Sequence, residues 1–88
     1  NKRYIIDRTY VDNNDVRWII DYKTTPSPIN DIACFYETEQ KKHSLQLENY
    51  AQIFSHENRK IMLAIYYPLF GGYLEWRYKK KSSGICQL

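Results

Sequence analysis

The sequence is poor in the residues that cross-link a small protein or bind zinc. Its 88 residues include two cysteines, Cys34 and Cys86, which lie far apart and have neither CxxC nor Cys–His ligand spacing. A disulfide scaffold and a zinc finger are therefore both disfavoured, and free thiols are expected. Long hydrophobic runs are also absent: no stretch approaches the roughly 20 apolar residues that span a bilayer, and the start does not resemble a signal peptide. We therefore expect a soluble, cytoplasmic protein with no membrane partner.

The charge is nearly balanced, with 13 Lys and Arg against 10 Asp and Glu and a net charge of +3. This excess is too small to predict a nucleic-acid partner by itself. Three lysines form a run at residues 79–81, followed by two serines and a glycine, a composition typical of a solvated tail. Contact with phosphates is the alternative interpretation. The length allows only one small domain, so we expect a domain over residues 1–78 and a basic, flexible tail over residues 79–88.

Two strand-like segments open the chain. Residues 3–11 and 16–23 are rich in β-branched and aromatic side chains, and the Asp-Asn-Asn-Asp sequence between them favours a turn. Together they predict a β-hairpin. Pro26 and Pro28 prevent either a strand or a helix from continuing, and we expect a loop from there to about residue 37.

The second half of the chain predicts a helix and two further strands. Residues 38–56 have the period of a helix with one buried stripe. The stripe consists of Leu47, Tyr50, Ala51 and Phe54. Residues 60–67 form a nearly continuous apolar run, typical of a central strand covered on both faces, and residues 73–78 alternate as in a half-buried strand. The order β-β-α-β-β predicts an α/β fold in which a helix packs on a mixed sheet.

Charged residues interrupt the first two predicted strands at corresponding points. Asp7 and Asp21 each follow an apolar run, where burying an ionised carboxylate costs free energy unless a partner compensates it. Because Asp21 and Lys23 are separated by one residue, their side chains point to the same face of a strand. Two carboxylates and a backbone carbonyl suit Mg²⁺, and an ammonium group beside them could orient a water molecule. The alternative is a structural ion pair between Asp21 and Lys23.

Three short motifs in a fixed order resemble those of a known family. The motifs are Asp7-Arg8, Asp21-Tyr22-Lys23-Thr24 and, on the predicted helix, Gln46 with Tyr50. They resemble the Asp-Arg, DYKT and QxxxY motifs of the RecB-like branch of the PD-(D/E)XK nuclease superfamily, and the resemblance covers about residues 4–67. It implies a restriction-endonuclease-like mixed sheet with a packed helix, of which this chain would be a partial domain.

Two features differ from that family. Tyr4 occupies the position three residues before the first aspartate, where the family usually has glycine. The family also begins with a helix that often supplies a His or Glu to the metal, and this chain starts too late, at Asn1, to contain it. His43 and His56 follow the DYKT motif and are not expected to replace that ligand. The resemblance therefore implies the C-terminal portion of a nuclease domain, weakly active or inactive alone.

The resemblance also implies roles for individual residues. Asp7, Asp21 and the backbone carbonyl of Tyr22 would bind Mg²⁺ or Mn²⁺. Lys23 would position the attacking water and stabilise the charge that develops on the scissile phosphate. Two motif residues, Gln46 and Tyr50, would reach toward the site or the DNA from one helix face; the alternative is a helix-surface amide and a core aromatic. The expected DNA contacts are Arg8, Thr24 and His43.

The implied function is a metal-dependent DNA nuclease of the exodeoxyribonuclease type, within an ATP-dependent helicase-nuclease that acts in double-strand-break repair and recombination. Its partners would be DNA and the remainder of that polypeptide or complex, and a bacterial protein of this kind would associate with the nucleoid. Two alternatives stay open. One is a non-catalytic DNA-binding or scaffold module of the same fold, and the other is a small α/β protein-interaction domain in which the DxK sequence is coincidental.

Overall fold

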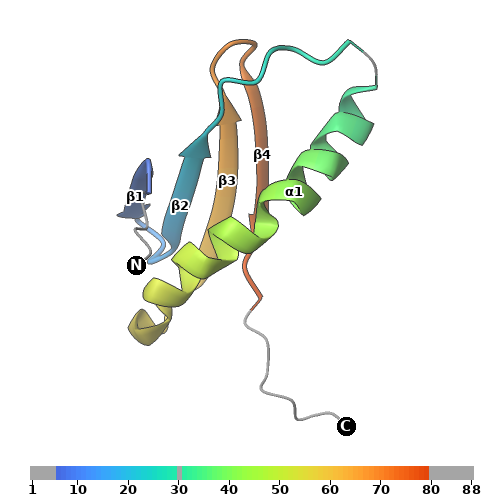
Figure 1. Cartoon of the computed structure of the whole chain (residues 1–88). Coiled ribbons are helices and arrows are strands. Elements are labelled where there is room, and N and C mark those ends of the chain that lie inside the picture. The colour runs from blue at the N-terminus through green and yellow to red at the C-terminus, as the bar shows by residue number, and fades with distance from the viewer. Residues whose placement is uncertain (1–5, 30, 80–88) are drawn as a thin grey trace, which may run out of the picture.

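The computed structural model describes residues 6–29 and 31–79 of the chain (Figure 1). Its elements are β1 (Arg8–Val11), β2 (Arg17–Tyr22), α1 (Ile32–Ile53), the short 3-10 helix η1 (Ser55–Glu57), β3 (Ile61–Tyr67) and β4 (Gly72–Arg77). This order confirms the predicted arrangement β-β-α-β-β. The predicted tail lies outside the described residues except for Lys79, so its flexibility stays a prediction.

The four strands form one mixed sheet in the order β1-β2-β3-β4. The pairs β1–β2 and β3–β4 are antiparallel, whereas β2 and β3 are parallel, with Asp21 opposite Ile65. A parallel pair needs a long crossover connection, which α1 supplies by crossing one face of the sheet (Figure 1). The carboxyl ends of β2 and β3 therefore lie at the same edge of the sheet.

The helix α1 begins earlier than its sequence pattern predicted. It starts at Ile32, so the loop that was expected to reach residue 37 ends at Asp31. The reason is a cap: Oδ1 of Asp31 accepts a 2.9 Å hydrogen bond from the backbone N–H of Ala33. The helix ends at Ile53, slightly before the predicted end, where the chain tightens into η1.

One side chain, Asp12, holds the turn between β1 and β2. Its Oδ1 accepts hydrogen bonds from the backbone N–H groups of Asn14 (2.8 Å) and Val16 (3.0 Å), and its Oδ2 accepts one from the Trp18 indole (2.9 Å). Asp15 has a φ of 65° in this turn, a conformation that Asp adopts more readily than most residues. The turn thereby fixes the register of β1 against β2.

The core lies between α1 and one face of the sheet. Its fully buried large side chains are Ile19, Leu47, Leu63, Ile65 and Tyr67. Side chains alternate along a strand, so the strand residues between the buried ones point to the other face of the sheet. No element within the described ranges covers that face (Figure 1). We call this second surface the open face. Its exposed aromatic side chains are Tyr10, Tyr22, Tyr66 and Tyr73.

None of the helices in the described ranges is long and apolar enough to cross a membrane. Cys34 is exposed and carries a free thiol, as the sequence predicted. Cys86 lies outside the described residues, so the corresponding prediction for it is not tested.

Candidate active site at the ends of the parallel strands

Asp21 and Lys23 lie at the carboxyl end of β2, on the side of the sheet that α1 covers. The Asp21 residue is only 6% exposed. The backbone N–H of Lys23 donates a 2.9 Å hydrogen bond to the Tyr66 carbonyl, which continues the pairing of β2 with β3 beyond Tyr22. Both side chains consequently point the same way, and Nζ of Lys23 is 2.8 Å from Oδ2 of Asp21.

Asp7 reaches this pair from the chain that precedes β1. Its Oδ2 accepts a 2.8 Å hydrogen bond from the backbone N–H of Tyr22, the residue between Asp21 and Lys23. That hydrogen bond is the main reason why the pKa of the Asp7 carboxyl is lowered, and Asp21 and Lys23 act in the same direction. The structure therefore brings together the two carboxylates and the lysine that the sequence singled out.

The pKa of Asp21 is raised, in contrast to the lowered pKa of Asp7. Burial is the largest cause of the raised pKa of Asp21, and the Asp7 carboxyl adds to it, while the Lys23 ammonium opposes it. A buried acid next to a second acid is stabilised in its ionised form by positive charge or by hydrogen-bond donors. Lys23 supplies one such charge, and a cation would supply more.

The donor atoms of this site fit a divalent cation of the magnesium type. Oδ2 of Asp21 is buried, and no described residue donates a hydrogen bond of normal geometry to it, although the Lys23 ammonium is within ion-pair distance. Such an oxygen gains a partner when a cation binds. Within residues 6–29 and 31–79 no three His, Cys, Asp or Glu side chains converge as a metal-binding group. Magnesium needs only one or two carboxylates, because water and phosphate oxygens complete its coordination.

A second buried carboxylate, Glu39 on α1, was missed by the sequence reasoning. It is 6% exposed, and its Oε1 accepts a 2.9 Å hydrogen bond from the hydroxyl of Tyr67 at the end of β3. Nε2 of His43, one helical turn further on, is 3.4 Å from the same oxygen. The available signal was the four-residue spacing of Glu39 and His43, but the helix was expected to start only at residue 38, which left Glu39 in a frayed first turn.

His43 belongs to the surroundings of the candidate site. Burial is the main cause of its lowered pKa, and the Lys23 ammonium lowers it further, whereas Glu39 and Asp21 raise it. The helix thus brings a largely neutral imidazole near the Asp21–Lys23 pair. A neutral imidazole has one N–H donor and one acceptor nitrogen available.

Gln46 and Tyr50 share one face of α1, as their spacing predicted. Nε2 of Gln46 donates a 3.1 Å hydrogen bond to the Tyr50 hydroxyl. The Tyr50 ring is part of the hydrophobic core, whereas Gln46 is exposed. The pair therefore combines a packed aromatic ring with a polar group that faces outward.

The remaining two predicted DNA contacts, Arg8 and Thr24, make no hydrogen bond or ion pair with the carboxylates within the described ranges. Arg8 is paired with Ile20 in the sheet, and its guanidinium lies 5.1 Å from the centre of the Tyr10 ring on the open face. Thr24 is exposed, and its hydroxyl makes no hydrogen bond with any residue in the described ranges. The structure thus groups His43 with the carboxylates and leaves Arg8 on the other side of the sheet.

Comparison with protein families matches residues 5–83 to the PD-(D/E)XK nuclease superfamily. The chain belongs to this superfamily. The mixed sheet with one packed helix is consistent with the restriction-endonuclease-like fold of PD-(D/E)XK proteins. Asp21-Tyr22-Lys23 has the D-X-K form of the superfamily's name, and Ile6 precedes Asp7 where that name has proline. No curated protein and no solved structure gives a significant match.

Proposed function

We propose that the protein is a metal-dependent nuclease that hydrolyses phosphodiester bonds in DNA, with Mg²⁺ or Mn²⁺ as its cofactor. One observation carries the proposal: Asp7 converges with the buried Asp21 beside Lys23, at the carboxyl end of the parallel strand pair. Such a placement raises the free energy of the ionised site in the absence of a cation. The same placement favours binding of a divalent cation. Membership of a nuclease superfamily also supports metal-dependent hydrolysis of phosphodiesters.

Each of the grouped residues has a distinct role in this proposal. Asp7, Asp21 and the Tyr22 backbone carbonyl hold the cation, which supplies the positive charge that polarises a phosphodiester. Lys23 hydrogen-bonds the attacking water and stabilises the negative charge that grows on the phosphate oxygens. The Asp21 carboxylate also orients the Lys23 ammonium, because the two groups are only 2.8 Å apart.

The residues of α1 and the exposed side chains around the site contact the substrate in this proposal. His43 and Gln46 are directed to the DNA from the helix, and the Tyr50 hydroxyl holds the Gln46 amide in position. Arg8 and Thr24 would contact phosphates further from the scissile bond. Because Arg8 lies on the open face, its contact requires DNA to pass over the edge of the sheet.

The wider context is also part of the proposal. The DYKT sequence at residues 21–24 and the Gln46–Tyr50 pair support an exonuclease of the RecB-like branch, linked to a helicase motor in double-strand-break repair and recombination. Such an enzyme works in the cytoplasm, at the nucleoid in a bacterium. Degradation of linear but not circular duplex DNA would support the exonuclease type, and equal cleavage of both would contradict it.

Cleavage with matched variants tests the core of the proposal. Labelled DNA is incubated with the protein and Mg²⁺ or Mn²⁺, with the variants Asp21→Asn and Asp15→Asn and with a chelator. We expect slow cleavage that requires metal and is abolished by Asp21→Asn. Asp15→Asn removes the same charge in the β1–β2 turn, where Asn also tolerates the positive φ, and should retain activity. Cleavage that survives Asp21→Asn would contradict the assignment.

A non-catalytic DNA-binding module is the second candidate. The observation that favours it is the Asp21–Lys23 ion pair itself, since an ammonium at 2.8 Å already compensates part of the buried charge. This candidate predicts DNA binding without cleavage, and no change in melting temperature when Mn²⁺ is added.

A further inference from the structure

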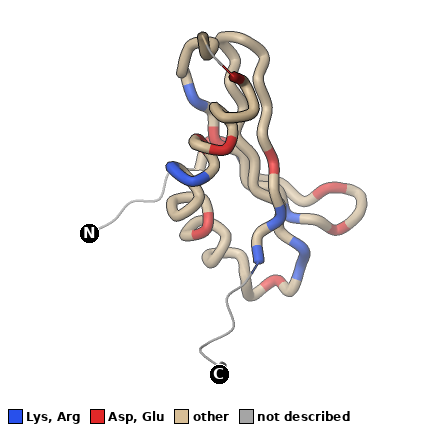
Figure 2. Tube along the Cα trace, turned by 90° about the vertical axis from the view of Figure 1, so that its right-hand side faces the viewer, with Lys and Arg blue, Asp and Glu red and all other residues tan. Residues whose placement is uncertain are grey.

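The end of the sheet opposite to the candidate active site carries a cluster of cations. Figure 2 shows several basic segments close to the point where the described chain ends. Lys60 directly precedes β3, Arg77 ends β4, and Lys79 follows two residues later. We call these three residues the basic cluster, and all of them are exposed.

Strand pairing places the basic cluster on one face. The pairing of β4 with β3 extends to Arg77, and a 2.9 Å hydrogen bond from the Tyr78 N–H to the Ile61 carbonyl continues it by one residue. Lys79 is thereby placed opposite Lys60, and alternation puts both on the same face of the sheet as Arg77. The Cβ atoms of such cross-strand partners are about 5 Å apart, and like charges at this spacing destabilise a hairpin. The Arg77 and Lys79 side chains also border a groove against α1.

No described acidic residue forms an ion pair with the basic cluster, whereas acidic residues pair with the cations around it. Within residues 6–29 and 31–79 no carboxylate lies at ion-pair distance from any of its three side chains. Neighbouring Arg59 is paired with Asp15 at 2.8 Å, and Arg17 is paired with Glu57. The positive charge of the cluster is therefore available to a ligand.

Asp12 and Glu75 lie near the basic cluster and have other partners, and Glu37 and Glu48 on α1 line a neighbouring groove together with Arg77 and Lys79. The pKa of Asp12 is lowered chiefly by the Trp18 indole and only in small part by Lys60, and both Asp12 oxygens accept hydrogen bonds within the β1–β2 turn. Glu75 lies on the same face as Arg77, where it interacts with the Tyr73 hydroxyl. These acids reduce the local charge without neutralising it.

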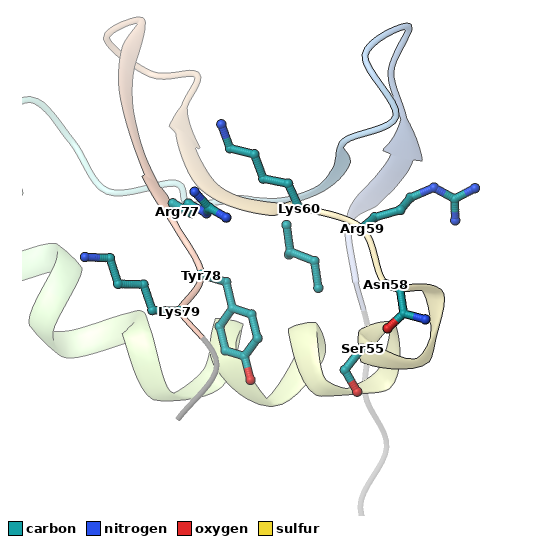
Figure 3. A pocket seen from close by; sticks show the side chains of 8 residues that line it. Ser55, Asn58, Arg59, Lys60, Arg77, Tyr78 and Lys79 are labelled. Carbon is teal, nitrogen blue, oxygen red and sulfur yellow. The ribbon is translucent and has the colours of Figure 1, made fainter. Parts of the chain in front are cut away.

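The basic cluster borders a groove of about 460 Å³ between the start of β3 and the end of β4 (Figure 3). The other lining residues are Ser55, Asn58, Arg59, Ile61 and Tyr78. In Figure 3 the Arg59 side chain points away from those of the basic cluster, in keeping with its ion pair. The Asn58 amide adds a neutral hydrogen-bond donor, whereas the Tyr78 side chain points toward α1 (Figure 3). Cations combined with neutral hydrogen-bond donors are the groups that bind nucleic-acid phosphates.

We propose that the basic cluster binds the phosphate backbone of a nucleic acid, as a second contact separate from the carboxylates. The inference rests on the proposed function, since it adds a further contact to the same substrate. β3 has seven residues, so at about 3.3 Å per residue the cluster lies about 20 Å from the candidate active site. One strand of a duplex has a phosphate about every 3.4 Å along the axis, so this separation corresponds to about six base pairs. Because the two sites lie on opposite faces of the sheet, a duplex that contacts both also passes over the sheet edge.

The salt dependence of binding tests this contact. Fluorescence anisotropy in a chelator, without cleavage, measures the affinity for single-stranded and duplex DNA over a range of NaCl concentrations. Replacing all three residues (Lys60→Gln, Arg77→Gln, Lys79→Gln) should reduce the slope of log K against log[NaCl] by about 2.7 for a duplex contact or about 2.1 for a single-strand contact. Lys42→Gln is the matched control, because it removes one exposed positive charge on α1, across the sheet from the open face.

The outcomes separate this inference from the proposed function. An unchanged slope in the triple variant overturns the inference even if the protein cleaves DNA. So does a reduction of the slope in Lys42→Gln equal to that in each single variant of the cluster. A reduced slope supports it even if no metal-dependent cleavage is found. Each single variant should lower the slope by about 0.9 on a duplex, which keeps the test valid if the triple variant fails to fold. Circular dichroism melting curves confirm folding of every variant.

Discussion

The backbone N–H of Tyr22 donates a 2.8 Å hydrogen bond to Oδ2 of Asp7. This contact ties the chain before β1 to the strand that carries the other carboxylate, so Asp7 and Asp21 are held together by the backbone and not only by their side chains. The Asp7 side chain also interacts with that of Asp21. The relationship predicts how substitutions at Asp7 should differ.

Asp7→Asn should preserve the hydrogen bond to Tyr22, because an amide oxygen accepts as a carboxylate does, while it removes repulsion between the two acids. We expect the metal-free melting temperature to change little, because relief of the unfavourable effect on Asp21 offsets the loss of the charged Asp7 contacts. The increase that Mn²⁺ gives to the parent, through binding to the folded state, should disappear. Asp7→Ala should in addition lower the free energy of unfolding by about 1 kcal/mol, since the Tyr22 N–H then lacks its acceptor.

Thermal melts of the parent and both variants, each with Mn²⁺ and with chelator, check these expectations. A parent protein that shows no metal-dependent shift would contradict the metal site. A large destabilisation by Asp7→Asn in chelator would instead indicate a purely structural carboxylate.

Lys23→Ala should slow cleavage by about a hundredfold or more while DNA and metal affinities change little, because the ammonium acts mainly on charge that develops in the transition state. Single-turnover rates and anisotropy binding curves measure the two effects separately. Parallel losses of rate and DNA affinity would place Lys23 among the residues that position phosphates.

Glu39→Ala should destabilise the fold by about 2 kcal/mol, because the buried hydroxyl of Tyr67 loses its acceptor. The control is Glu37→Ala on the same helix, whose side chain is 72% exposed and lies 4.0 Å from Lys41; its effect should stay within about 0.5 kcal/mol. Urea unfolding of both variants gives the comparison. Equal effects would show that the Glu39–Tyr67 contact contributes nothing specific.

The turn at Asp12 should make stability depend on pH. Hydrogen bonds from the Trp18 indole and from backbone N–H groups lower the pKa of Asp12 below its ordinary value of 3.8. Because the folded state favours the ionised form, the resulting stabilisation is complete above that value and is lost as the pH falls below it. Asp12→Asn should therefore destabilise the protein at pH 6 and have a much smaller effect near pH 2. Urea unfolding followed by Trp fluorescence measures this, and an effect independent of pH would contradict it.

The sequence predicted the order of elements because its signals are local. Alternation, turn residues and the spacing of Leu47, Tyr50 and Ala51 each depend on a few neighbouring side chains. The start of α1 was predicted wrongly because a nearby proline-rich segment favours a loop, and this hid the helix cap at Asp31. Periodicity alone did not identify which residue ends that loop.

For the candidate site, the sequence predicted only part of the geometry. The side chains of Asp21 and Lys23 were expected on one face from their spacing. The approach of Asp7 was expected from its matching place at the end of an apolar run and from the resemblance between motifs. Glu39 was missed, because its burial results from packing against Tyr67, a residue 28 positions away in the sequence. The roles of these residues stay predictions until they are measured.

The parallel pairing of β2 with β3 has a consequence for how the protein folds. The hairpins β1–β2 and β3–β4 join neighbouring segments, whereas the parallel pair must close a long loop that contains α1. We expect the hairpins to form first and the parallel pair to close late, so the site acquires its geometry only near the end of folding. Ile19→Val, at the parallel interface, should then speed unfolding more than it slows folding, as stopped-flow kinetics would show.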